Sequence, residues 1–211
     1  MRRIAGVVTC IGLVLMPVAA IGQEKTASGI NLDAHQKDIV DKVSSYFSGI
    51  HTLQGSFLQT DSADRRMKGK FYLSRPGRFR FDYARPSRQI VISDGRYLAV
   101  QDLDLNTEDR VELDQTPFRL LLSTDVNLVR DAQIMGFQQS DDLIVVALQG
   151  KDPDAGGQLT LYLATKPNIE LKAWSTKDAQ GVETRVEISD LAKGVDLDAE
   201  MFKIAPVGWV E

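Results

Sequence analysis

From residue 52 onward, the chain is a series of short segments in which apolar and polar residues alternate, spaced about ten residues apart. Turn-forming pairs such as Pro76-Gly77 and Asp94-Gly95 separate these segments, which is typical of an antiparallel meander. We predict eleven strands, at residues 52–60, 66–74, 78–84, 88–93, 96–102, 109–114, 129–138, 142–149, 158–165, 169–176 and 181–190. So many strands favour closure or strong curvature of the sheet over a small open sheet.

Three segments depart from this alternation. Residues 33–49 place apolar residues at helical spacing, including Val40, Val43 and Phe47, which predicts an amphipathic helix. A short helix is expected after Thr116, with this threonine at the cap and Pro117 at the first helical position. A last helical turn is expected at residues 198–202. The fold class is therefore mainly β with a few short helices.

The N-terminus has the pattern of an export signal. Arg2 and Arg3 precede an apolar run from residue 4 to 20 that is too short for a comfortable membrane span. We interpret residues 1–22 as a signal peptide, with cleavage after Ala20 as the alternative, residues 23–32 as a polar linker and residues 33–211 as one domain. Cys10, the single cysteine, would leave with the leader, which excludes disulfides and thiol chemistry in the mature chain.

Charge opposes nucleic-acid binding, although residues 68–83 alternate cations with aromatics. Without the leader, the formal charge would be about −6, which disfavours a polyanionic ligand. Period-two alternation also puts Phe71 and Phe79 on one face of the sheet and Lys70 and Arg80 on the other. Base stacking and phosphate contacts need both residue types on one surface. We therefore expect no nucleic-acid partner.

We expect this aromatic face to continue along the neighbouring strands. The residues concerned are Phe71, Leu73, Phe79, Phe81, Tyr83, Ile90, Ile92, Leu98, Val100 and Leu113, joined by Phe118, Leu121 and Leu122 of the short helix. Such a stripe can fill the solid core of a sheet. It can also line a hydrophobic ligand cavity on the concave side of a curved sheet. Periodicity alone leaves both interpretations open.

Catalytic and metal chemistry lack the residues that they need. His35 and His51 are the only histidines, and their spacing fits neither a metal site nor a catalytic triad. Residues 102–106 copy the start of a calcium loop, but Thr107 and Leu113 stand where glycine and glutamate are required. We predict no cofactor, no metal and no enzymatic activity.

Three stretches together resemble one protein family. They are Gly69-Lys70-Phe71-Tyr72-Leu73-Ser74-Arg75-Pro76-Gly77-Arg78-Phe79-Arg80-Phe81-Asp82-Tyr83, then Ser93-Asp94-Gly95, then Thr116-Pro117-Phe118 with Leu120 to Leu122. Their order and spacing are similar to those of the periplasmic outer-membrane lipoprotein carrier (LolA) family. The resemblance implies an unclosed antiparallel β-barrel covered by short helices, with a hydrophobic cavity for acyl chains.

The resemblance also implies a function and partners. The expected role is a monomeric periplasmic carrier that takes triacylated lipoproteins from an inner-membrane ABC exporter to an outer-membrane acceptor or receptor. Arg75 and Pro76 are expected to gate the lid, because the arginine at this position in the family contacts the backbone of a lid helix. The alternative is a periplasmic regulatory module of the same fold that senses lipid or lipoprotein, and an exported hydrolase is a more distant third.

Overall fold

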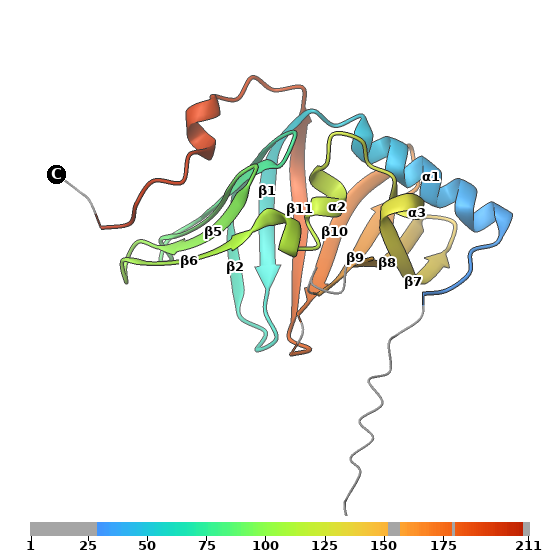
Figure 1. The fold of residues 1–211 in the computed structure, drawn as a ribbon, viewed down its shortest axis with the longest axis horizontal. Coiled ribbons are helices and arrows are strands. Elements are labelled where there is room, and N and C mark those ends of the chain that lie inside the picture. Colours follow the sequence, from blue (N-terminus) through green and yellow to red (C-terminus); the bar gives the residue numbers. More distant parts are fainter. Residues whose placement is uncertain (1–28, 152–156, 179, 209–211) are drawn as a thin grey trace, which may run out of the picture.

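The computed structural model describes residues 29–151, 157–178 and 180–208. Eleven strands form one antiparallel sheet in the order β6-β5-β4-β3-β2-β1-β11-β10-β9-β8-β7 (Figure 1). The strands are β1 (Thr52–Thr60), β2 (Arg66–Ser74), β3 (Arg78–Tyr83), β4 (Gln89–Asp94), β5 (Tyr97–Asp102), β6 (Thr107–Glu112), β7 (Ala132–Gln139), β8 (Leu143–Gly150), β9 (Gln158–Ala164), β10 (Glu170–Lys177) and β11 (Glu183–Lys193). All eleven predicted strands are therefore present. The proposed signal peptide, and the linker as far as residue 28, lie outside the described residues.

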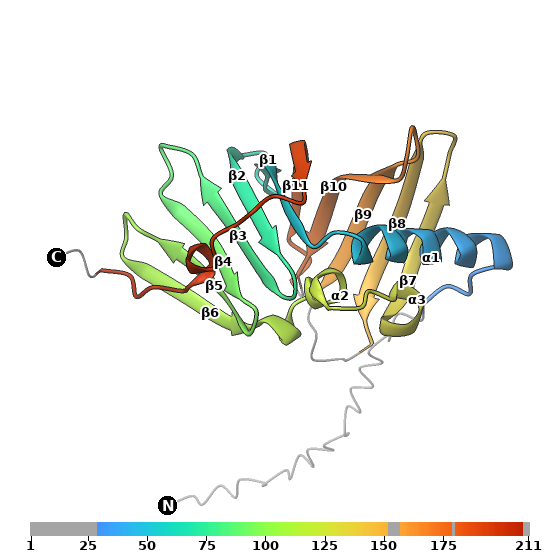
Figure 2. The ribbon, with the colours of Figure 1, turned by 90° about the horizontal axis from the view of Figure 1, so that it is seen from above.

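The sheet is curved and does not close. Strands β6 and β7 stand at its two ends and do not pair with each other, while the pairing of β1 with β11 joins the two halves of the meander (Figure 2). The amide of Ile30 donates to the Ile134 carbonyl, so the start of the described chain covers part of the β7 edge. The prediction of an unclosed, mainly β barrel is confirmed.

Helix α1 (Ala34–Ser48) matches the predicted helix. Asp33 and Gln36 form a capping box, in which each side chain accepts a hydrogen bond from the backbone amide of the other residue. The buried face of the helix, which includes Val40, Val43 and Phe47, joins the main hydrophobic core. In Figure 2, α1 crosses in front of β7, β8 and β9. It therefore covers one half of the sheet.

The predicted cap at Thr116 is wrong. A 3₁₀ turn, η1 (Leu113–Gln115), comes first, and the Thr116 hydroxyl donates to the Leu113 carbonyl at the end of that turn. Helix α2 (Arg119–Leu122) begins three residues later and has no side-chain cap. Thr116 therefore ends one turn instead of starting the next, because its hydroxyl finds a carbonyl partner three residues earlier.

The start of the predicted seventh strand is also wrong. Residues Leu128–Asp131 form helix α3, and β7 begins only at Ala132. The Asn127 side chain accepts a hydrogen bond from the Arg130 amide and so caps this helix. The last helical turn, η2 (Ala199–Phe202), lies where it was predicted, with Asp198 at its cap.

The register of β2 and β3 confirms the prediction for residues 68–83. Phe71 pairs with Phe81, and Leu73 pairs with Phe79, so these four side chains share one face. That face is the concave one, which α1 and α2 cover, because all four belong to or pack against the two core clusters. The lysines and arginines of both strands lie on the opposite face.

Candidate functional site

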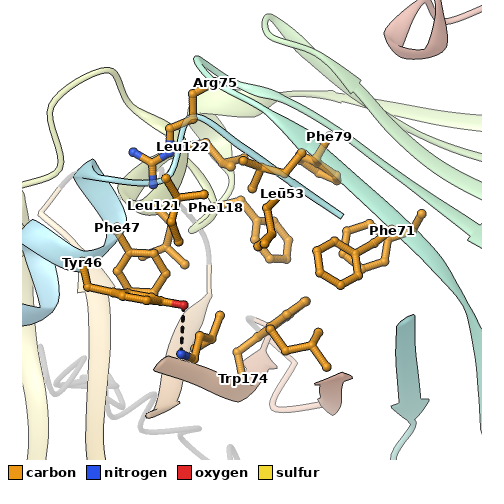
Figure 3. Close-up of a pocket in the computed structure, with 15 residues that line it drawn as sticks. Tyr46, Phe47, Leu53, Phe71, Arg75, Phe79, Phe118, Leu121, Leu122 and Trp174 are labelled. Carbon is orange, nitrogen blue, oxygen red and sulfur yellow. Dashed lines mark hydrogen bonds between the residues drawn. The ribbon is translucent and has the colours of Figure 1, made fainter. Parts of the chain in front are cut away.

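An apolar cavity lies between the concave face of the sheet and the two helices α1 and α2, which together we call the lid (Figure 3). Strands β1, β2, β3, β10 and β11 form its floor. Its lining residues are Tyr46, Phe47, Ile50, Leu53, Phe71, Leu73, Arg75, Phe79, Phe81, Phe118, Leu121, Leu122, Leu171, Trp174 and Ile188. Arg75 is the only charged residue among them. The arrangement is suited to a ligand that is bound by apolar contact area.

The cavity is nearly filled in this structure. Its free volume is about 80 Å³, whereas sites for small molecules usually measure roughly 300–1,000 Å³. Side chains of the lid account for the difference, since Phe47, Leu121 and Phe118 all point into the cavity (Figure 3). The structure therefore shows a closed state. A long aliphatic chain would enter only if the lid moved away from the sheet.

Phe81 is the centre of the aromatic wall of the cavity. Its ring lies 5.0 Å from that of Phe57, 5.5 Å from Phe71 and 5.8 Å from Phe79, measured between ring centroids. It also makes an edge contact with Trp174 of β10 at 6.0 Å. Edge and offset contacts of this kind contribute about 0.5–1.5 kcal/mol each beyond burial of area. Phe81 therefore links the two halves of the curved sheet.

The structure brings part of the predicted cavity set together. Seven of its members line the cavity, namely Phe71, Leu73, Phe79, Phe81, Phe118, Leu121 and Leu122, and Arg75 lines it as well. The other six do not line it, and these are Tyr83, Ile90, Ile92, Leu98, Val100 and Leu113. Pro76, predicted with Arg75 to gate the lid, is not among the lining residues either. Some residues of the second group face the other side of the sheet, and the rest lie farther along it from the cavity.

Ile90 and Ile92 were assigned to the wrong face. They pair with Asp82 and Arg80, and therefore point to the convex side of the sheet. Ile92 is nonetheless 1% exposed, because η2 packs against β3 and β4. The run Ile90-Val91-Ile92 is apolar at three consecutive positions. Alternation therefore does not show which of these residues face the concave side of the sheet.

The remaining predicted residues lie near the cavity or beyond it. Leu98 and Leu113 form a second cluster with Phe79 and Leu122, next to the cavity. Val100 pairs with Val91 on the concave face but is 38% exposed. Tyr83 contacts Phe57, and its hydroxyl donates to Gln59 Oε1 at 2.5 Å. Burial raises the pKa of the Tyr83 hydroxyl to about 12.

Sequence reasoning missed the cavity residues that come from α1 and the distant strands. These are Tyr46, Phe47, Ile50, Leu53, Leu171, Trp174 and Ile188. The α1 residues do belong to the apolar face of the predicted helix, and the strand residues do alternate. What was missing was the pairing of β1 with β11, which places the two ends of the meander side by side. No local pattern reveals that contact.

Two hydrogen bonds fasten α2 to the turn between β2 and β3. The Arg75 guanidinium donates from Nη1 to the Ser123 carbonyl at 3.0 Å, and the Gly77 amide donates to the Leu122 carbonyl at 2.9 Å. We call this pair of bonds the α2 latch. Both acceptors are carbonyls at the C-terminal end of α2, which that short helix leaves without intrahelical partners.

Arg75 is held in a costly environment. Burial lowers the pKa of its guanidinium to about 10, and its Nε atom is buried without a hydrogen-bond partner. A buried donor without an acceptor costs about 1–3 kcal/mol. The bond from Nη1 to the Ser123 carbonyl offsets part of this cost in this structure.

Helix α1 is attached separately. The Leu171 amide donates to the Tyr46 hydroxyl at 3.1 Å, next to the register shift between Leu171 and Ala173 in the ladder of β9 and β10. Burial raises the pKa of this hydroxyl. Ser44 and Ser48 also accept hydrogen bonds from the amides of Leu128 and Val126. The two helices of the lid therefore have different attachments.

Replacing Tyr46 by phenylalanine is expected to lower the free energy of unfolding by about 1–2 kcal/mol, because the partly buried Leu171 amide loses its acceptor. The midpoint of urea unfolding measures this change. Tyr162→Phe is the matched control, since this tyrosine packs under Arg185 through its ring. Equal midpoints for the two variants would contradict the assigned role of the Tyr46 hydroxyl.

Residues 29–151, 157–178 and 180–208 contain no group of three or more His, Cys, Asp or Glu side chains that could hold a metal ion. Within the same ranges, none of the helices has both the length and the apolar character needed to cross a membrane.

Comparison with known proteins places this architecture in a family. Two relatives named outer-membrane lipoprotein carrier protein are similar to the chain. The one from Methylococcus capsulatus is 30% identical over 179 residues, covering 81% of this chain and 85% of the relative. The one from Chromobacterium violaceum is 27% identical over 187 residues, covering 85% and 89%. A solved LolA superfamily protein from Nitrosomonas europaea has 15% identity and a TM-score of 0.47, covering 80% of this chain and 97% of its own.

The match to the family covers most of the chain and is not limited to one motif. Residues 48–205 match the profile described as outer membrane lipoprotein carrier protein LolA. This range includes all eleven strands, α2 and the Arg75 turn. The chain therefore belongs to the LolA family of outer-membrane lipoprotein carrier proteins.

Proposed function

We propose that this protein is a periplasmic carrier of lipoproteins and not an enzyme. In this proposal, residues 1–22 direct export, residues 23–32 form a linker, and residues 33–211 act as a monomeric carrier domain. The domain receives triacylated lipoproteins from an inner-membrane ABC exporter and delivers them to an acceptor in the outer membrane. The relatives' names, outer-membrane lipoprotein carrier protein, support the class of cargo.

The observation that carries the proposal is the apolar cavity under a fastened lid. Exposing an acyl chain to water costs about 0.8 kcal/mol per methylene, so a lipoprotein needs shelter between two membranes. The aromatic and aliphatic lining accepts chains by contact area and shape, without requiring a specific polar group. Delivery also requires release, and the lid supplies it by competing for the same apolar surface.

The lid sets how tightly cargo is held. In the closed state, Phe47, Phe118 and Leu121 occupy the space that acyl chains would take. Cargo binding must therefore supply the free energy that opens the lid, and the observed affinity falls by that amount. A carrier needs this moderation because a site that held its cargo too tightly would not pass it on.

Depletion of the protein in its own organism tests the proposal. Lipoproteins are expected to accumulate at the inner membrane within a few doublings, and restoring the gene should redistribute them. Fractionation of the two membranes, followed by immunoblotting of outer-membrane lipoproteins, provides the measurement. An unchanged distribution, together with an altered envelope stress response, would favour the regulatory alternative and contradict the carrier proposal.

A further inference from the structure

A second cleft, with both charged and apolar lining residues, lies on the other side of the turn between β2 and β3. It has a volume of about 650 Å³. Its lining residues are Pro76, Gly77, Arg78, Asp94, Gly95, Arg96, Leu113, Asp114, Arg119, Leu122, Ser123 and Thr124. It shares only Leu122 with the lining of the apolar cavity. The cleft is therefore a separate site, formed by two strand turns and the end of α2.

Within the described residues, the three arginines of this cleft form no ion pair, as is also true of Arg66, Arg75 and Arg85. Six other arginines of the described chain form ion pairs with nearby carboxylates, namely Arg65, Arg80, Arg88, Arg110, Arg130 and Arg185. Asp94 lies in the cleft, but its Oδ1 atom already accepts hydrogen bonds from the amides of Arg96 and Tyr97. Positive charge in the cleft is therefore only partly compensated by Asp94 and Asp114.

Arg119 and Arg96 are the side chains best placed to bind an anion. Arg119 lines the cleft, and its terminal nitrogens, unlike its buried Nε atom, are open to an incoming carboxylate. The Arg96 guanidinium lies over the ring of Tyr97, 5.0 Å from its centroid. Arg78, in contrast, donates to Ser74 Oγ and lies over Phe202, away from the others.

The cleft is also in contact with the α2 latch. Gly77 lines the cleft and supplies the amide of the latch, while Leu122 and Ser123 also line the cleft and supply the two carbonyls of the latch. A ligand in the cleft would therefore touch both sides of the latch. Binding in the cleft is therefore linked to the position of α2.

We propose that this cleft binds an acidic segment of a partner protein, which brings carboxylates to Arg96 and Arg119 and biases the lid. The proposal rests on the carrier function, since it assigns a docking signal to the lid of that carrier. A protein segment fits better than a membrane surface, because the cleft is recessed between two turns and includes two carboxylates.

The test uses the empty protein and needs no lipoprotein. The probe is a short peptide of alternating glutamate and glycine, with alternating glutamine and glycine as its uncharged counterpart. Amide shifts in NMR titrations report binding, and the amides of Gly77, Gly95 and Thr124 are expected to move. R96Q/R119Q should weaken binding of the glutamate peptide about tenfold. R66Q/R85Q, which removes two exposed arginines elsewhere, should change it less than about twofold.

Further measurements separate the cleft from other sites. Arg96 lies on an exposed turn that should tolerate substitution, and R96Q alone should weaken binding of the glutamate peptide about threefold. Binding of a fluorescent fatty acid to R96Q/R119Q should remain unchanged, which separates this site from the carrier cavity. An affinity for the glutamate peptide that is unchanged by both cleft substitutions would overturn the proposal. So would equally tight, cleft-dependent binding of inorganic phosphate or phosphatidylglycerol vesicles, since either would point to a phosphate ligand instead.

Discussion

Replacing Arg75 by leucine should give a folded carrier that accepts cargo but delivers it about tenfold more slowly. The closed state would lose the hydrogen bond from Nη1 to the Ser123 carbonyl, which is a bond from a charged group and contributes about 1.5–3 kcal/mol. The cargo-bound state, in contrast, would lose an unfavourable charge beside the acyl chains and gain apolar contact. Both changes favour the loaded form over the empty form.

Transfer from the purified carrier to outer-membrane vesicles measures this effect, with the loaded fraction followed over time. Arg85→Leu is the matched control, because Arg85 also precedes a proline but is exposed at the turn between β3 and β4. Delivery at the wild-type rate by the Arg75 variant would show that the latch does not govern release. Slow delivery by both variants would point to a general effect of surface charge.

Replacing Gly69 by alanine should destabilise the fold by about 3 kcal/mol or more. A Cβ atom on Gly69 would lie 2.6 Å from the Phe57 ring and closer still to the Asp82 carbonyl oxygen. Neither neighbour can yield easily, because Phe57 is packed between Phe81 and Tyr83 and Asp82 belongs to the neighbouring strand β3. Gly69 therefore allows the aromatic wall to lie flat against β2.

The midpoint of urea unfolding again provides the measurement. Gly136→Ala is the control for the same chemical change in another strand, since its Cβ atom would meet only the Ala147 Cβ at an ordinary 3.6 Å. That variant should be neutral or slightly more stable, by up to about 1 kcal/mol. A Gly69 variant that unfolds at the wild-type midpoint would mean that the β2 and β3 backbones separate without cost.

Much of the sheet could be predicted because its signals are local. Turn pairs such as Pro76-Gly77 and period-two alternation locate strands without reference to distant residues. The short helices were less predictable. Helices α2 and α3 have only four residues each, which is too short for a clear helical period, so Thr116 was misread as a cap and α3 as strand.

The cavity was only partly predictable because it depends on register and long-range pairing. Phe71 and Phe79 were correctly placed on one face, since a tight turn joins their strands. In the continuous apolar run that contains Ile90 and Ile92, the sequence did not show which residues face the cavity. Both isoleucines face the convex side of the sheet. Trp174 could not be placed in the cavity without the pairing of β1 with β11. The closed lid is a property of packing, which no sequence pattern encodes.

Quenching of Trp174 by a brominated fatty acid tests the central claim most directly, namely that the closed cavity opens to hold acyl chains. Trp174 lines the cavity, and Trp209→Phe makes it the single tryptophan of the chain. Saturable quenching by the brominated chain, and none by its unbrominated counterpart, is the expected result. Binding of the brominated chain without any loss of Trp174 fluorescence would place the acyl chain elsewhere and contradict the account.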